Sequence, residues 1–262
     1  MQVLLLGLHL PLHSQDNATA DSSGVIVRDL RDIWHDAGEI LLAPLHFDNA
    51  GWLTTAAVVG GTALLSPLDE SSRRVARRSQ SSSADNFAEV GRQYGREIYG
   101  LTLSGGLYIG GLVFKNAEVR QTGVMLLESI AFAGITTTVL KSIMGRSRPY
   151  VEEGAYRFRG FQFQNDHLSL PSGHSTVAFS VSSVLAGRIK NAYATIGLYS
   201  LATLTAFSRV YGDEHWLSDT FLGAAIGTAV GISVVSLHEG GDPSSSIHVT
   251  PTLGGVKLTY DF

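Results

Sequence analysis

Apolar residues gather in six stretches that are separated by short polar connections. The stretches lie at 52–67, 98–114, 122–140, 173–187, 191–207 and 219–237. Each is long enough for several helical turns, and none shows a convincing alternation of apolar and polar residues that would indicate a strand. The pattern therefore predicts an all-α protein, a helical bundle with about six core helices.

A further helix is predicted ahead of the bundle, over residues 25–41. Its apolar positions recur at helical spacing, and charged residues fill the opposite face. These apolar positions are Val27, Leu30, Ile33, Trp34, Ala37 and Leu41. Pro44 follows and ends the helix. We expect this amphipathic helix to pack on the bundle or to lie on a membrane surface.

The two ends of the chain differ from the bundle. Residues 1–24 begin with a mostly apolar run that resembles a secretory signal, although no Lys or Arg precedes it, so we interpret them as a signal-like or disordered segment. Residues 25–240 form the predicted helical domain. In the tail, 241–262, apolar and polar residues alternate after Gly254 and Gly255, which predicts a short β-hairpin.

Composition excludes several classes of function. Charged residues make up 16% of the chain and the formal net charge is −4, so we expect no nucleic-acid partner. The chain has no cysteine, which excludes disulfides, thiolate metal sites and a cysteine nucleophile. Hydrophobic residues make up 44%, which suits a tightly packed bundle or a membrane protein.

Two features bear on whether the bundle crosses a membrane. Gly223, Gly227 and Gly231 recur every fourth residue, as in close packing of membrane helices, but soluble bundles use the same geometry. The apolar stretches run about 15–19 residues, at or below the lower limit for spanning. An integral and a peripheral bundle both remain open at this level.

Candidate chemistry lies in three short stretches at the edges of apolar segments. They are Lys141-x6-Arg148-Pro149, Pro171-Ser172-Gly173-His174 and Ser208-Arg209-x5-His215-x3-Asp219. Together they contain three cations that could hold an oxyanion, two histidines, and a carboxylate one helical turn after the second histidine. Preorganised positive charge and a histidine nucleophile fit phosphoryl transfer.

Each stretch also has a purely structural interpretation. Ser172 could cap the helix that begins at Gly173, and the first backbone N–H groups of that helix could equally bind an anion. His215 and Asp219 share a helix face because they lie four residues apart. A carboxylate at that spacing can select the tautomer of the imidazole, but such pairs are also common on helix surfaces.

The three stretches in this order resemble the signature motifs of the type 2 phosphatidic acid phosphatase superfamily. This superfamily also contains bacterial class A acid phosphatases and vanadium haloperoxidases, and the resemblance covers roughly residues 50–238. It implies that His215 forms a phosphohistidine, that Asp219 orients His215, and that His174 is the general acid. The implied phosphate-binding residues are Lys141, Arg148, Ser172, Gly173 and Arg209. It also implies that catalysis needs no metal and no other cofactor.

The resemblance implies a metal-independent phosphatase for phosphomonoesters or pyrophosphates. The expected substrates are lipid-linked, such as phosphatidate, phosphatidylglycerophosphate or undecaprenyl pyrophosphate, and the expected location is the inner membrane or periplasm of a bacterial envelope. Two alternatives stay open. One is a soluble periplasmic acid phosphatase that acts on small phosphoesters, and the other is a vanadate-dependent haloperoxidase. The sequence does not set the oligomeric state.

Other residues receive weaker interpretations. In the six-span topology of the family, the arginine-rich connection 69–97 would lie on the same, non-cytoplasmic side as the active site, where the positive-inside rule disfavours it. Asp213 and Glu214 could raise the basicity of His215 or discourage strongly anionic substrates, but we interpret them as solvated loop carboxylates. His238 has no metal-ligand spacing and is interpreted as an ordinary polar residue. The link 150–170 is predicted to be a substrate-selecting lid.

Overall fold

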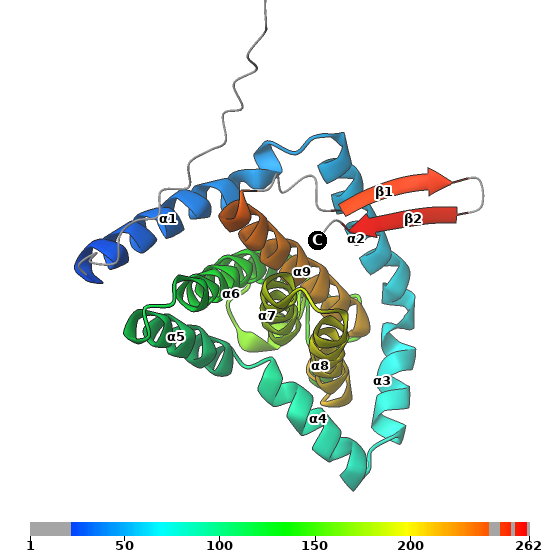
Figure 1. Cartoon of the computed structure of the whole chain (residues 1–262). Coiled ribbons are helices and arrows are strands. Elements are labelled where there is room, and N and C mark those ends of the chain that lie inside the picture. The colour runs from blue at the N-terminus through cyan, green and yellow to red at the C-terminus, as the bar shows by residue number, and fades with distance from the viewer. Residues whose placement is uncertain (1–21, 241–246, 253–254, 261–262) are drawn as a thin grey trace, which may run out of the picture.

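The computed structural model describes residues 22–240, 247–252 and 255–260. Within these ranges the chain is a bundle of helices followed by two short strands (Figure 1). The predicted all-α class is therefore confirmed. The signal-like segment predicted at 1–24 lies almost entirely outside the described residues, as does most of the predicted turn of the hairpin.

Every predicted apolar stretch is a helix. In chain order these helices are α2 (Asn49–Leu65), α5 (Glu97–Val113), α6 (Ala117–Met144), α7 (Gly173–Ile189), α8 (Ala192–Tyr211) and α9 (Leu217–Glu239). The observed α6 and α9 are longer than the apolar stretches that predicted them, because polar residues also occupy their terminal turns. Asn116 begins α6 by accepting a hydrogen bond from the N–H of Val119, as an N-cap does.

The remaining elements flank these helices. The predicted amphipathic helix is α1 (Ser22–Leu42), and two further helices, α3 (Asp69–Arg78) and α4 (Ser82–Tyr94), fill the arginine-rich connection. Short 3₁₀ turns occur at Ala43–Leu45, Ser66–Leu68, Pro149–Val151 and Asn165–His167. The strands β1 (Ile247–Thr252) and β2 (Gly255–Tyr260) pair antiparallel, with Ile247 opposite Tyr260.

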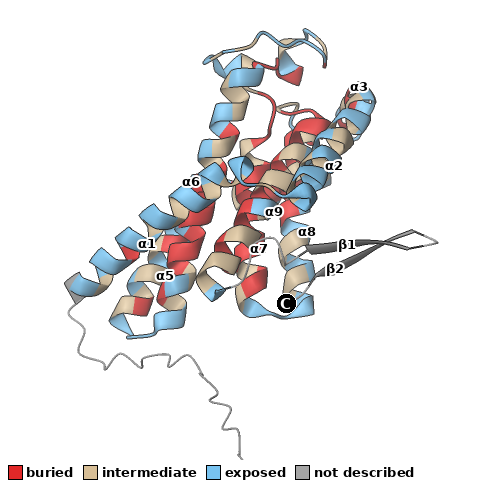
Figure 2. Ribbon diagram, turned by 90° about the horizontal axis from the view of Figure 1, so that it is seen from above, coloured by how far each residue is buried: buried red, intermediate tan, exposed pale blue. Residues whose placement is uncertain are grey.

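The hydrophobic core lies between α6, α7 and α9, where buried residues are concentrated (Figure 2). It contains Met125, Leu126, Ile130, Phe132, Ala133, Val177, Val181, Val184, Val230, Val234 and Val235. Burying one side chain of the Val, Leu or Phe type contributes about 1.5–3 kcal/mol relative to leaving it in water. The core therefore holds together the helices whose ends carry the three motifs.

The glycine face of α9 packs directly on α7. A Cβ atom at Gly223, Gly227 or Gly231 would fall closer to backbone oxygens of α7 and its N-cap than van der Waals contact allows. The oxygen met at Gly227, for example, belongs to Thr176. Close helix packing is therefore the reason for glycine at these positions.

The apolar face of α1 is divided between two environments. Ile33 and Ala37 pack against the core, as predicted. Leu30 and Trp34 instead face outward, and Trp34 is 83% exposed. The predicted packing on the bundle therefore holds for one edge of the helix, while the other edge presents large apolar side chains to the surroundings.

Within the described residues, three helical segments are long and apolar enough to cross a membrane, judged by length and composition. They are Asn49–Arg78, Ala117–Met144 and Leu217–Glu239. The first includes α2, none of whose residues is buried, although its side chains are mostly apolar and Leu64 is 80% exposed. An unburied apolar helix of this kind suits contact with lipid better than contact with water.

Candidate active site

The three motifs meet at one end of the bundle, where α6 and α8 end and α7 and α9 begin. Lys141 lies in the last turn of α6 and Arg209 in the last turn of α8. Gly145 ends α6 in the left-handed conformation, with φ of 57°, which glycine adopts without strain. His174 lies in the first turn of α7, and His215 lies just before α9. The three stretches thus lie close together because the ends of α6 and α8 lie close to the starts of α7 and α9.

Two of the three predicted cations are tied to the connection between α6 and α7. Lys141 Nζ donates to the carbonyl of Leu168 at 2.6 Å. Arg148 Nε and Nη2 each donate to Asn165 at 2.8 Å, one to its carbonyl and the other to its side-chain oxygen. These bonds orient both side chains and do not involve Nη1 of Arg148, which pairs with Glu214.

Glu214 places a carboxylate between the two arginines. Its Oε2 lies 2.7 Å from Arg148 Nη1 and 3.4 Å from Arg209 Nη2. Among the described residues, the buried Nε of Arg209 has no hydrogen-bond partner. The Glu214 carboxylate is thus paired with two arginines, although its side chain remains 39% exposed, so its interpretation as a purely solvated loop carboxylate needs correction.

His215 and Asp219 lie together, as their spacing predicts, without a hydrogen bond between them. His215 is 3% exposed, and its Nδ1 lies 3.6 Å from Asp219 Oδ2, beyond hydrogen-bond distance. No hydrogen-bond partner for Nδ1 occurs in the described part of the chain. A small movement of the ring would bring the two atoms within hydrogen-bond distance.

Asp219 is itself held by three donors. Arg146 Nη1 donates to Oδ1 at 2.6 Å, while the Ser169 hydroxyl at 2.5 Å and the Trp216 N–H at 2.9 Å donate to Oδ2. Charge-assisted bonds of this number fix the carboxylate in one position. The residue predicted to orient His215 is therefore oriented by its own neighbours.

Arg146 and Asp69 form a buried network that sequence reasoning missed. Arg146 is 2% exposed and pairs with Asp69 Oδ2 at 2.7 Å as well as with Asp219. Asp69 also accepts hydrogen bonds from the backbone and hydroxyl of Ser218. The position of Arg146 inside the first motif was a usable signal. Asp69 lies 150 residues before Asp219, and no local spacing connects the two.

The environment of His174 and His215 strongly favours their neutral forms. Burial, followed by the charges of Lys141, Arg148 and Arg209, lowers the pKa of His215 well below its usual value. Burial and the same cations, Arg209 foremost, lower the pKa of His174 to about 3. A neutral imidazole is what a nucleophile needs. A general acid needs a proton, and the negative charge of a bound phosphate would favour that protonation.

The predicted backbone cradle lies beside Lys141. A Cβ atom at Gly173 would lie 3.8 Å from Lys141 Cε. The N–H of Ser172 is already used, since it donates to the Asp219 carbonyl at 2.9 Å. The Ser172 hydroxyl makes no capping bond to α7, and instead accepts from the Ser175 hydroxyl at 3.2 Å. The alternative role of Ser172 as an N-cap is therefore not adopted.

The arginine-rich segment contacts the same loops. Arg73 of α3 donates to both carboxylate oxygens of Asp213, at 2.6 and 2.8 Å, and to Glu152 at 3.1 Å. Asp213 is thus paired, contrary to its interpretation as a solvated carboxylate. The segment lies on the active-site side, as the family topology requires, and acidic partners offset part of its positive charge.

Comparison with known protein families supports the grouping of the three motifs. The profile of the PAP2 superfamily matches residues 122–240, a range that contains all three motifs. Residues 122–240 are a PAP2 superfamily domain. The resemblance predicted from the motifs is thereby confirmed. Asp69 and Arg73 both lie in α3, which precedes the matched segment.

Relatives that match part of this chain include proteins named as lipid phosphatases. A lipid A 1-phosphatase of Rhizobium johnstonii is 29% identical over 114 residues, which are 42% of this chain and 45% of that protein. A lipid A 4'-phosphatase of Porphyromonas gingivalis is 26% identical over 124 residues, 44% of this chain and 50% of that protein. The chain thus matches about half the length of these relatives.

Two solved PAP2 structures share the fold. LpxE of Aquifex aeolicus aligns with a TM-score of 0.51 and 22% identity, covering 64% of this chain and 95% of that one. The transmembrane PAP2 type phosphatidylglycerolphosphate phosphatase of Bacillus subtilis aligns with a TM-score of 0.53 and 21% identity, covering 82% and 96%. At these identities the likeness establishes the architecture.

Proposed function

We propose that this chain is a membrane phosphatase that acts on phosphorylated lipids through a phosphohistidine at His215. The observation that carries the proposal is the carboxylate of Glu214, which bridges Arg148 and Arg209 near the buried His215. A site that draws one of its own anions between two arginines is electrostatically prepared for a phosphate group.

Substrate binding begins with an exchange of anions. A phosphate with nearly two negative charges displaces the single carboxylate of Glu214 from the two guanidinium groups. Arg148 and Arg209 each present a planar pair of donors to its oxygens, and Lys141 adds a compact positive charge. The cage then neutralises the charge that spreads over the equatorial oxygens during transfer.

The reaction proceeds in two displacements. Neutral His215 attacks phosphorus through its free ring nitrogen, and a nitrogen–phosphorus bond forms as the bond to the leaving oxygen breaks. Asp219 accepts a hydrogen bond from Nδ1–H and stabilises the imidazolium, while His174 donates its proton to the leaving oxygen. His174 then takes a proton from water while the water oxygen attacks phosphorus. The nitrogen–phosphorus bond breaks as the new oxygen–phosphorus bond forms, which releases inorganic phosphate and neutral His215.

A lipid substrate and a membrane location are supported by the surface and by the relatives. The outward apolar side chains of α2 and the three membrane-length segments suit a protein embedded in a bilayer. Matched relatives are named as lipid A phosphatases, and a structural neighbour is a phosphatidylglycerolphosphate phosphatase. We therefore place the protein in a bacterial inner membrane, with lipid A, phosphatidate, phosphatidylglycerophosphate and undecaprenyl pyrophosphate as candidate substrates.

A substrate panel tests the proposal and its rivals together. Protein purified in detergent is supplied with the four lipids and with p-nitrophenyl phosphate, and released phosphate is measured. We expect at least one lipid to be hydrolysed faster than the soluble ester. Preference for the soluble ester would support a non-specific acid phosphatase. Bromide oxidation in the presence of vanadate and peroxide would support the haloperoxidase alternative.

The chemistry itself is tested at the nucleophile. Replacing His215 with Gln should abolish phosphate release and remove acid-labile phosphate trapped on the protein after rapid quenching. Full turnover by a folded H215Q variant would contradict the proposed mechanism. The neighbouring Asp213→Asn variant is the matched control, because Asp213 faces Arg73 and not the two histidines.

A further inference from the structure

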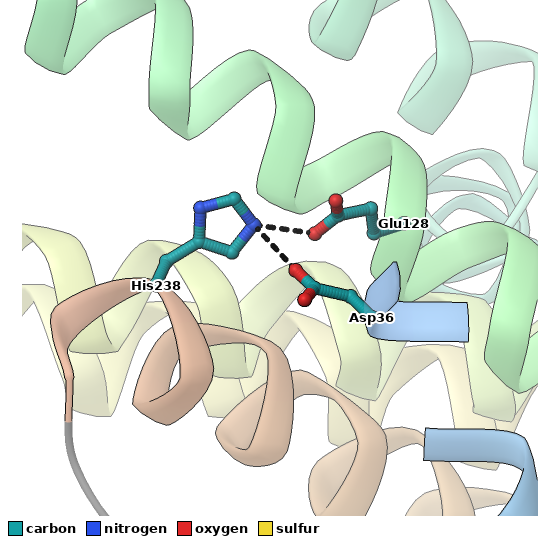
Figure 3. A group of neighbouring side chains, drawn as sticks. All are labelled: Asp36, Glu128 and His238. Atoms are coloured by element: carbon teal, nitrogen blue, oxygen red, sulfur yellow. Dashed lines mark hydrogen bonds and ion pairs between the residues drawn. The ribbon is translucent and has the colours of Figure 1, made fainter. Parts of the chain in front are cut away.

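A second cluster of polar side chains lies away from the three motifs, where α1, α6 and α9 meet (Figure 3). His238, in the last turn of α9, directs Nε2 at two carboxylates. The distance is 2.7 Å to Glu128 Oε2 of α6 and 3.3 Å to Asp36 Oδ2 of α1. One ligand atom from each of the three residues lies within 4.8 Å of the others.

The cluster is incompletely satisfied by the protein. Glu128 is 1% exposed, and its buried Oε1 has no hydrogen-bond partner among the described residues. A buried carboxylate oxygen without a partner is costly. One imidazole can donate only one hydrogen bond through Nε2, yet two carboxylates approach that atom, and the charge of Asp32 also acts on Glu128. Two carboxylates therefore converge on one imidazole nitrogen, and either a proton or a cation at this point would offset their charge.

We propose that Asp36, Glu128 and His238 bind a divalent cation, with Zn²⁺ as the best-fitting ion. Imidazole nitrogens and carboxylate oxygens are both Zn²⁺ ligands, with bonds of about 2.0–2.2 Å. In a tetrahedral site such bonds separate neighbouring ligand atoms by about 3.3 Å. The distance from His238 to Asp36 already has this value, and the distance to Glu128 needs to widen by only about half an ångström.

This site is separate from the proposed phosphatase site. His238 lies 19 residues after Asp219 on the same helix, which places it about 28 Å away along the axis. The bound ion joins three helices, since its three ligands come from α1, α6 and α9. A second polar contact already links α1 to the bundle nearby, where Asp29 pairs with Arg120 and accepts from the Tyr108 hydroxyl at 3.0 Å.

Metal binding is measured on the purified protein in detergent. After treatment with a chelator, the protein is dialysed against Zn²⁺ and the bound metal is quantified by mass spectrometry. We expect one Zn²⁺ per chain, and Co²⁺ in its place should give the intense visible absorption of a tetrahedral site. The variants Asp36→Asn, Glu128→Gln and His238→Gln should bind Zn²⁺ at least about 100-fold more weakly.

Two control variants separate this site from other histidines. The first control is His35→Gln. His35 is next to Asp36, and its ring is largely exposed, so this variant should bind Zn²⁺ like the unmodified chain. His215→Gln should also keep the metal, because His215 belongs to the other end of the bundle. Loss of the metal in H215Q with retention in E128Q would place the ion among the motif residues and would overturn the proposal.

A measurement on the unmodified protein covers the case in which a variant fails to fold. Zn²⁺ should raise its Tm by several degrees and slow amide hydrogen exchange over residues 29–40 of α1, because the ion ties this helix to α6 and α9. Absence of bound Zn²⁺, or binding that leaves exchange in α1 unchanged, would refute the site.

Discussion

Nδ1 of His215 lies 3.6 Å from Oδ2 of Asp219, while that carboxylate is held by Arg146, Ser169 and Trp216. The carboxylate is thus fixed before the imidazole reaches it. In the proposed reaction the ring closes this gap as positive charge develops on it, so the hydrogen bond is stronger in the transition state than in the empty site. Interactions of that kind raise kcat.

The first prediction concerns Asp219. Replacing it with Asn should lower kcat by about 10²–10⁴-fold, because an amide can no longer select the correct tautomer of His215 or stabilise its cation. Steady-state kinetics on the best lipid substrate provide the measurement. Ser169→Ala, which removes one donor to the carboxylate but keeps the charge, should lose far less. An equal loss in both variants would contradict an electrostatic role for Asp219.

The second prediction concerns Glu214. Replacing it with Gln removes the charge that competes with phosphate for Arg148 and Arg209, so inorganic phosphate should inhibit about tenfold more strongly, equivalent to about 1.4 kcal/mol. KM for the lipid should fall in parallel. Asp213→Asn is the control, because its carboxylate pairs with Arg73. Inhibition that is unchanged in E214Q would show that the carboxylate does not compete for the phosphate position.

The third prediction is a proton uptake linked to ligand binding. His174 has a pKa of about 3 in the empty site, below the value of about 6.5 expected in the unfolded chain. Between these values the folded protein binds fewer protons than the unfolded chain, so this histidine contributes stability above pH 6.5 that is lost as the pH falls through that range. A bound phosphate offsets the surrounding cations and should return a proton to His174.

Calorimetry in two buffers with different ionisation enthalpies measures this proton. At pH 5.5–6, binding of inorganic phosphate should take up close to one more proton in the unmodified protein than in His174→Gln, since the ionisation of phosphate itself is common to both. Identical uptake in the two proteins would show that His174 stays neutral in the complex, and would remove it as the general acid.

The fourth prediction concerns stability of the buried network. Replacing Arg146 with Gln leaves Asp69 and Asp219 without their cation and should destabilise the protein by about 3–5 kcal/mol. The control is Arg159→Gln, which breaks a partly exposed pair with Glu153 and should cost less than about 1 kcal/mol. Denaturant unfolding in detergent distinguishes the two. Equal losses would mean that burial of the Arg146 network adds little.

The fifth prediction uses two glycines in helices. Gly227→Ala should destabilise by about 1–3 kcal/mol because the added methyl group meets the backbone of α7. Gly197→Ala in α8 is the matched change, since a Cβ there meets nothing within 4 Å, and it should be neutral or stabilising by about 0.5–1 kcal/mol. Melting curves of both variants test the comparison.

Much of the fold follows from local patterns. The apolar stretches predict the core helices well because a helix records its buried face within its own residues. The polar first turn of α6 was missed, since residues such as Glu118 lie outside the apolar run. The outward orientation of Trp34 could not be predicted either, because periodicity places residues on a face without saying what that face contacts.

Some residues of the candidate site could be predicted from local sequence, and others could not. Lys141, His174 and His215 could be found because each lies within a compact motif at a helix end. Asp69 and Arg146, and the trio of Asp36, Glu128 and His238, depend on contacts between segments far apart in the chain. Such contacts arise only when the bundle is assembled, and a single sequence contains no spacing that reports them.

The glycine contact between α7 and α9 has a consequence for how substrates are selected. His174 begins one of these helices and His215 immediately precedes the other, so the distance between the two imidazoles is set by two backbones in direct contact. Backbone contact leaves no side chain whose exchange could adjust that distance. If the proposed reaction is right, we expect variation in substrate choice to come from the loops and outer helices around the two histidines and not from this contact.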